Sequence, residues 1–162
     1  MLAIYLNDHL LGSTAGLELV RRARKASEGS ELGDLLERLE AEIDEDRETL
    51  REAMAAVDAG EDKAKVVAGW TAEKLGRLKL NGKLIGHSPL STVVELEGLS
   101  LGIQGKAALW KMLGATDDPR LAEFDFEALW KRAERQSAEL EPHRIAAGEA
   151  AFAAAPAGRG PA

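Results

Sequence analysis

A heptad-like stripe of apolar residues in the segment 31–59 constrains this chain more than any other feature. Steps of four and three residues give Leu32, Leu36, Leu39, Ile43, Asp46, Leu50, Ala53 and Val57. Such spacing puts these side chains on one face of a helix that packs against other helices. Asp46 interrupts the stripe, and burying a lone carboxylate costs several kcal/mol unless it is paired, protonated or bound to a metal. The stripe therefore predicts a helical bundle with a polar site inside it.

Composition supports helices and excludes several functions. The chain of 162 residues has the length of one domain, and its aromatic content is only 4%, so aliphatic side chains must fill the core. A net charge of −7 argues against general nucleic-acid binding. The absence of cysteine excludes thiolate metal sites, disulfides and cysteine nucleophiles.

The chain shows no sign of membrane insertion or secretion. No uninterrupted apolar run approaches the roughly 20 residues of a membrane-spanning helix. The N-terminus lacks a basic region and reaches Asp8 early, so it does not read as a secretory signal. We therefore expect a cytoplasmic protein.

Apolar periodicity and turn residues divide the chain into helices and a tail. The expected helices cover about 2–27, 31–59, 62–80, 89–113 and 120–153, and residues 1–152 form one bundle domain. Ser30 is the expected N-cap of the second helix, and Gly60 is expected to end it. Pro142 predicts a kink near 137–139 or a break in the last helix. The tail 153–162 has no periodicity and is expected to be disordered.

The order of the helices predicts an all-α, up-down four-helix bundle. Short turns join the first helix to the second and the helix at 89–113 to the last, so each pair forms an antiparallel hairpin. The segment between the hairpins holds a crossover helix, about 62–80, which at 1.5 Å per residue would span roughly 27 Å. That length is enough to leave the second helix and the helix at 89–113 parallel.

The crossover segment 62–88 is basic. Its charged residues are Lys63, Lys65, Lys74, Arg77, Lys79 and Lys83 against Asp62 and Glu73, which gives a net charge of +4. An anionic partner could bind here, but we prefer a crossover helix that lies against the acidic flank of the bundle. Trp70 and Leu75 are expected to cover an outer apolar side of the helix at 89–113, formed by Leu96, Leu99, Ile103 and Trp110.

Each of the other long helices also carries a polar residue on its expected inner face. These faces read Leu2, Leu6, His9, Ser13, Gly16 and Val20; Leu90, Val94, Glu97, Leu101, Gln104 and Ala108; and Phe126, Leu129, Ala133, Gln136, Leu140 and His143. Counting residues back from the turns places His9 about one turn from Asp46, and Glu97 near Gln136 with Glu139 close by. Glu42 falls opposite Gly16.

These positions supply the donors of a metal site. The candidate ligands are His9, Glu42, Asp46, Glu97, Glu139 and His143. Four carboxylates and two imidazoles are the ligand set of dinuclear sites in ferritin-like bundles, and such donors suit iron, manganese or zinc. A site of this kind could support redox or oxygen chemistry, or store iron.

In helix order and inward polar residues, residues 2–152 resemble the ferritin-like superfamily. The family motif is a Glu on the first helix and Glu-x-x-His on the second, repeated on the third and fourth. Glu97 fits this pattern, His9 stands where the first Glu would be, and Glu139 and His143 are one residue too far apart. The resemblance implies a metal bound in the bundle core, and a mononuclear site, another metal or a lost site all stay open.

Structural interpretations of the same residues carry equal weight. Asp46 and His9 could form a buried ion pair, and Glu97 could share a hydrogen bond with Gln136. The polar layer would then only set helix pairing, in a non-enzymatic bundle that acts by association with itself or with a partner. A pocket for a small ligand is a third interpretation of these residues. The small residues at 12–16 indicate either close helix packing, the commoner reason, or room beside Glu42 and Asp46.

Overall fold

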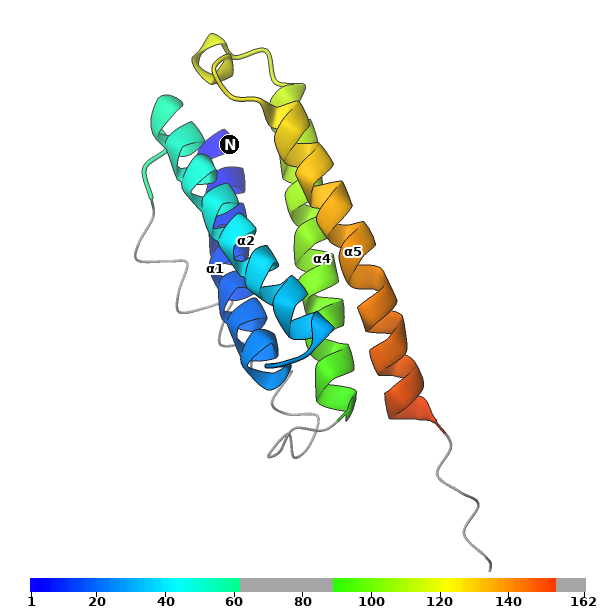
Figure 1. Ribbon diagram of the computed structural model, residues 1–162. Helices are drawn as coiled ribbons and strands as arrows, with labels where there is room; N and C mark the ends of the chain where they lie inside the picture. The colour runs from blue at the N-terminus through cyan, green and yellow to red at the C-terminus, as the bar shows by residue number, and fades with distance from the viewer. Residues whose placement is uncertain (62–88, 154–162) are drawn as a thin grey trace, which may run out of the picture.

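The described part of the chain is an all-helical bundle. The computed structural model describes residues 1–61 and 89–153, which form four long helices and a short 3₁₀ turn (Figure 1). They are α1 (Leu2–Ala26), α2 (Glu31–Ala56), α4 (Pro89–Gly114), η1 (Pro119–Leu121) and α5 (Phe126–Phe152). The predicted crossover helix at 62–80, its basic charge and its contacts through Trp70 and Leu75 lie outside the described residues, as does the tail beyond 153.

The helices form two antiparallel hairpins, α1 with α2 and α4 with α5. Figure 1 shows that α2 and α4 run in the same direction. Helix α1 packs against both α2 and α4, whereas α5 packs mainly against α4 and approaches α2 closely at few positions. None of the described helices combines the length and the apolarity that crossing a membrane requires.

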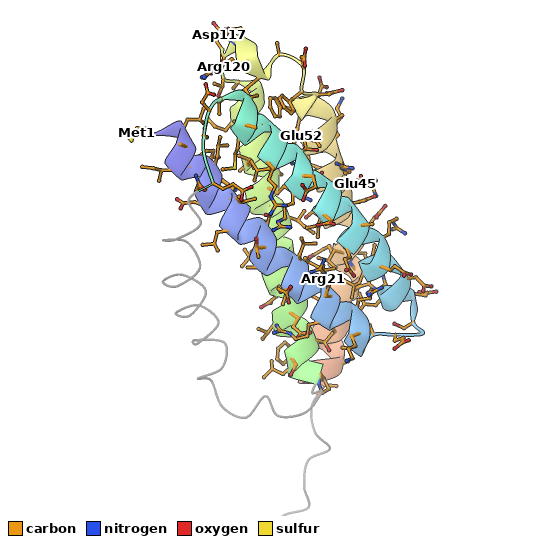
Figure 2. All side chains as sticks on the ribbon, turned by 90° about the vertical axis from the view of Figure 1, so that its left-hand side faces the viewer. Met1, Arg21, Glu45, Glu52, Asp117 and Arg120 are labelled. Carbon is orange, nitrogen blue, oxygen red and sulfur yellow. The ribbon has the colours of Figure 1, made fainter. Side chains whose placement is uncertain are left out.

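The apolar stripe of α2 is buried as its spacing predicts. Every stripe position from Leu36 to Val57 is buried, Asp46 included, and Leu32 is partly buried. Ser30 is the N-cap, and its hydroxyl accepts a hydrogen bond of 3.2 Å from the Gly33 amide. Charged side chains, among them Arg21 and Glu45, lie on the outside of α1 and α2 (Figure 2).

Two predicted helix ends are wrong. Helix α2 ends at Ala56 rather than 59, because Asp58, and not Gly60, takes the left-handed conformation (φ 56°) that terminates it. The last helix begins at Phe126 rather than at residue 120, because the Asp125 carboxylate caps it by accepting from the Ala128 amide at 2.9 Å. Pro142 does not break α5, which continues to Phe152.

The inner face predicted for α4 is also wrong, by half a turn of the helix. Leu90, Glu97 and Leu101 are exposed. The positions that face the bundle are Leu96, Leu99, Ile103, Lys106, Trp110 and Leu113. The reason is that α4 is apolar on two opposite sides, and the side with Trp110 offers more volume to the core. Leu96, Leu99, Ile103 and Trp110 therefore form no outer surface for Trp70 and Leu75 to cover.

The core consists of two apolar clusters with a polar layer between them. On α2 the first cluster reaches Ile43 and the second starts at Leu50, so Asp46 lies between them. On α4 the corresponding residues are Ile103 and Leu109, with Lys106 between. The polar residues of α2 and α4 therefore interrupt the core at the same level of the bundle.

The small residues of α1 do not serve close packing. A Cβ atom added at Gly12 or Gly16 would meet no atom of the described residues within 4 Å, whereas one at Gly33 would lie 2.3 Å from the Ser27 carbonyl oxygen. Among the described residues no other helix approaches Gly12 or Gly16 closely, which differs from the close-packing interpretation.

We expect Gly12→Ala and Gly16→Ala each to raise the free energy of unfolding by about 0.5–1 kcal/mol, because alanine reduces backbone freedom in the unfolded chain without a clash. Urea unfolding at neutral pH measures the change. Gly33→Ala is the contrasting variant and should destabilise the protein. Equal effects at all three positions would contradict the packing described for α1.

Candidate functional site: a buried ion network

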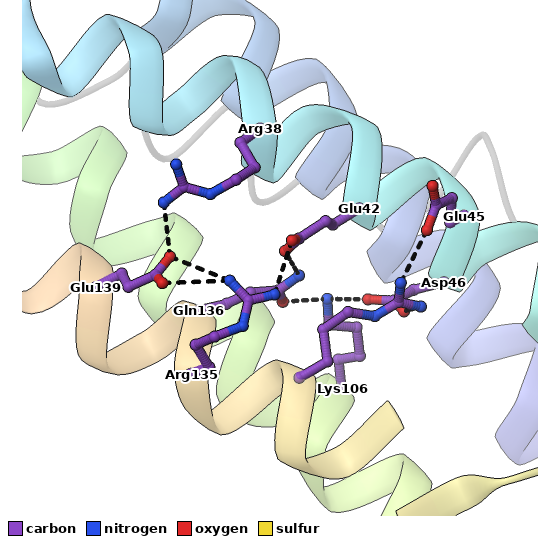
Figure 3. Close-up of polar contacts among 9 residues, drawn as sticks. Arg38, Glu42, Glu45, Asp46, Lys106, Arg135, Gln136 and Glu139 are labelled. Atoms are coloured by element: carbon purple, nitrogen blue, oxygen red, sulfur yellow. Dashed lines mark hydrogen bonds and ion pairs between the residues drawn. The ribbon is translucent and has the colours of Figure 1, made fainter. Parts of the chain in front are cut away.

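The Asp46 carboxylate is held by two cations from two other helices. Its side chain is only 2% exposed, yet Lys106 Nζ of α4 donates to Oδ2 and Arg132 Nη2 of α5 donates to Oδ1. Figure 3 shows Asp46 and Lys106 pointing toward each other between the helices. Both oxygens are therefore satisfied by opposite charges, which is the condition under which a buried carboxylate is tolerated.

Gln136 connects this pair to a second carboxylate. The Gln136 side chain is fully buried, and its Oε1 accepts from Lys106 Nζ at 2.6 Å. Its Nε2 donates to Glu42 Oε2 at 2.7 Å, and Arg135 Nη2 donates to the other Glu42 oxygen, also at 2.7 Å. A glutamine can do this because it carries both a donor and an acceptor at one end.

Ion pairs continue the contact along the α2–α5 seam. Arg38 Nη2 lies 2.8 Å from Glu139 Oε2, and Arg132 Nη1 lies 2.8 Å from Glu45 Oε2. For each turn further along α2, the partner residue lies one turn earlier on α5, as antiparallel helices require. Long charged side chains thus bridge two helices whose backbones approach closely at few positions.

We call these nine residues the ion network (Figure 3). Its members are Arg38, Glu42, Glu45, Asp46, Lys106, Arg132, Arg135, Gln136 and Glu139. Four carboxylates face four cations, so the formal charges cancel. The network is buried at Asp46 and Gln136 and reaches solvent at Glu45 and Arg38, where ion pairs contribute little to stability.

Burial and pairing shift the pKa values of Lys106 and Glu42 in the buried part of the network. Burial lowers the pKa of Lys106 below its ordinary value, and the neighbouring Asp46 carboxylate opposes that change. Burial pushes the pKa of Glu42 upward, but hydrogen bonds from Gln136 and Arg135 outweigh it and hold the pKa below its ordinary value. Residues of α5 therefore favour the charged form of Glu42, whereas at Lys106 the Asp46 carboxylate opposes the effect of burial.

The structure brings three of the six predicted metal ligands into one network. Glu42, Asp46 and Glu139 all belong to it, but each binds cationic side chains. Within the described ranges 1–61 and 89–153, no group of three or more His, Asp or Glu residues is placed to hold a metal ion.

The other three predicted ligands lie elsewhere. His9 packs edge-on against the Tyr5 ring at 4.7 Å, and burial lowers its pKa, with Asp8 acting in the opposite sense. Glu97 is 52% exposed and lies 3.5 Å from Arg144 in an outer groove between α4 and α5. His143 is partly buried on α5. Neither a His9–Asp46 ion pair nor a Glu97–Gln136 hydrogen bond forms, because Lys106 and Arg132 bind Asp46, and Lys106 and Glu42 bind Gln136.

This arrangement does not fit a dinuclear carboxylate centre. Such a centre needs carboxylate oxygens that converge on free space, whereas the Lys106 ammonium group sits where Asp46 and Gln136 converge. Sequence reasoning missed Lys106, Arg132, Arg135 and Arg38. A signal for Lys106 was present, because it continues the helical spacing of Leu99, Ile103, Trp110 and Leu113.

We expect Asp46→Asn to destabilise the protein by about 3 kcal/mol, because Lys106 and Arg132 would then face each other without the charge that pairs them. The double variant Asp46→Leu with Lys106→Met removes both charges and should recover most of that loss. Urea unfolding measures both. Lys131→Met, at the exposed Glu127 pair on α5, is the control and should change stability by less than about 0.5 kcal/mol. A similar loss in the double and single variants would contradict the pairing.

Stability should also fall in acid. The pKa of Glu139 is held low by hydrogen bonds from Arg38 and Arg135, as that of Glu42 is by Gln136 and Arg135. A carboxylate with a lowered folded-state pKa contributes stability that is complete above its ordinary value of 4.5 and is lost as the pH falls through the lowered value. Unfolding free energies measured from pH 7 to pH 3 should show this loss. Glu42→Gln should flatten the curve, and Glu52→Gln, exposed on α2, should leave it unchanged.

Comparison with protein-family models, with curated proteins and with solved structures found no match. The ferritin-like resemblance is therefore neither supported nor contradicted by relatives, and it stays a prediction from pattern.

Proposed function

We propose that this chain is a non-enzymatic helical-bundle protein that acts by association, and that its buried polar layer serves to pair the helices correctly. One observation carries the proposal: the Asp46 carboxylate on the apolar stripe of α2 is bound at both oxygens by cations from α4 and α5. A carboxylate satisfied in this way has no free oxygen directed at a substrate.

The ion network supports a role in pairing because it ties three helices at one register. If α5 slid by one turn along α2, Asp46 would lose Arg132 and keep only Lys106, and Glu42 would lose Arg135 and Gln136. Breaking a buried pair costs about 3–5 kcal/mol, which is a large share of the stability of a domain. Apolar contacts alone would tolerate such a slide better, because they depend little on direction.

Two hollows of the described surface lie away from the ion network. One of about 410 Å³ lies at the turn between α4 and α5, and the other, of about 730 Å³, is the outer α4–α5 groove. The polar layer is therefore separate from these two hollows, which fits a structural role for the layer.

Metal binding by carboxylates and histidines is the rival function, and one measurement separates the two. We expect protein purified without a tag to contain well below one equivalent of iron, manganese or zinc per chain by ICP-MS, both before and after aerobic Fe(II) loading. One or more equivalents, retained through gel filtration and lost in Asp46→Asn, would overturn the proposal.

A second variant in the same study tests the pairing role directly. Asp46→Leu, Lys106→Met and Gln136→Leu together replace the three most buried polar side chains of the layer by apolar ones. The triple variant should keep its helix content and much of its stability but lose a single helix arrangement, which appears as broadened or doubled amide peaks in NMR spectra. A triple variant with one sharp set of peaks would show that the network is not needed for pairing.

A further inference from the structure

Helix α4 carries an exposed apolar stripe on the side opposite its core face. Leu90, Leu101 and Met112 are 51, 69 and 57% exposed, and they follow one another at intervals of eleven residues. Eleven residues make about three turns, so the three side chains lie almost in line along the helix, over about 33 Å. Val94, partly buried, lies on the same line. An apolar stripe that the described residues leave exposed is typical of an interaction surface.

Small residues lie along and beside the stripe. Gly105 and Ala108 lie along it, and a Cβ atom at Gly105 would meet nothing within 4 Å. Beside Leu101 the α4–α5 groove is lined on the α5 side by the small residues Ser137 and Ala138. A large apolar side chain from a partner could therefore enter next to Leu101.

We propose that a second copy of this chain packs on the outer face of α4, antiparallel, with a two-fold axis close to Leu101. The spacing is what identifies the partner as the same chain. Leu90 and Met112 lie equally far from Leu101, so a two-fold axis there sets Leu90 against Met112 of the second copy and Leu101 against its own equivalent. The same operation sets Val94 against Ala108. A two-fold interface uses one patch twice and needs this self-complementarity.

Polar side chains on the face determine the direction of packing. Glu97 is the one ionisable residue on the line from Leu90 to Met112. Parallel packing would oppose the two copies of Glu97, and like charges at an interface are costly. Antiparallel packing about Leu101 sets Glu97 against Gly105 and next to Gln104, whose amide can donate a hydrogen bond to the carboxylate. Glu97 and Gln104 line the same exposed groove.

This inference deepens the proposed function, since it names the partner with which the bundle associates. The two proposals fail in different ways. If the dimer does not form, the chain is a monomer in solution. If the proposed function is wrong, the protein binds metal or the triple variant still gives one sharp set of NMR peaks. The ion network lies on the opposite side of α4 and would be unaffected by the dimer.

Analytical ultracentrifugation of the full chain at tens of micromolar tests the proposal. We expect a species of twice the monomer mass, and Leu101→Glu should weaken the dimer by about 100-fold or more, because two carboxylates would meet at the axis. Ala41→Glu adds the same charge at an exposed apolar residue of α2 and should leave the dimer intact. A wild-type monomer, as when other residues of the chain cover this face, would overturn the proposal.

Cross-linking then checks the direction, which is straightforward because the chain has no cysteine. Leu101→Cys should form a disulfide-linked dimer on oxidation. Leu90→Cys alone should not, but an equal mixture of Leu90→Cys and Met112→Cys should give a mixed dimer. Efficient cross-linking of Leu90→Cys with itself would indicate parallel packing and would overturn the antiparallel arrangement.

Discussion

The carboxylate of Asp46 needs opposite charge once it is removed from water, and the arrangement of the bundle follows from how that need is met. Lys106 and Arg132 reach it from α4 and α5, so one buried charge links three helices. Because ionic contacts depend on distance and direction, the proposed pairing role assigns to them a register that the aliphatic clusters on either side would not define alone. The core is accordingly two apolar clusters joined through a polar layer.

Helix α4 shows how a helix that is apolar on two sides can serve both a core and a surface. Its inner side supplies Trp110 to the core and Lys106 to the ion network, while its outer side leaves Leu90, Leu101 and Met112 exposed. The long α2–α5 seam is the reverse case, because charged side chains replace apolar contact there. The outer face of α4 is thus suited to association, whereas the α2–α5 seam is suited to exposure to solvent.

Much of the fold could be predicted from periodicity and turn residues. The stripe of α2, its Ser30 cap and the all-α class follow from local spacing, which a helix imposes on any sequence. The candidate site could not be predicted equally well. Asp46 stood out because it breaks an apolar pattern, but its partners lie 60 and 86 residues away, and no local rule connects them. Glu97 was assigned inward because α4 has two faces of similar apolarity.

The sequence by itself determined that this chain forms amphipathic helices and that Asp46 would be buried, because helical periodicity is a property of each segment alone. Only the tertiary structure decided what neutralises Asp46 and which side of α4 faces the core. Those outcomes depend on how four helices are rotated about their axes. Rotating α4 by half a turn about its axis puts Lys106 rather than Glu97 at the centre of the bundle. The centre then holds a network of paired charges instead of the predicted set of metal-binding carboxylates.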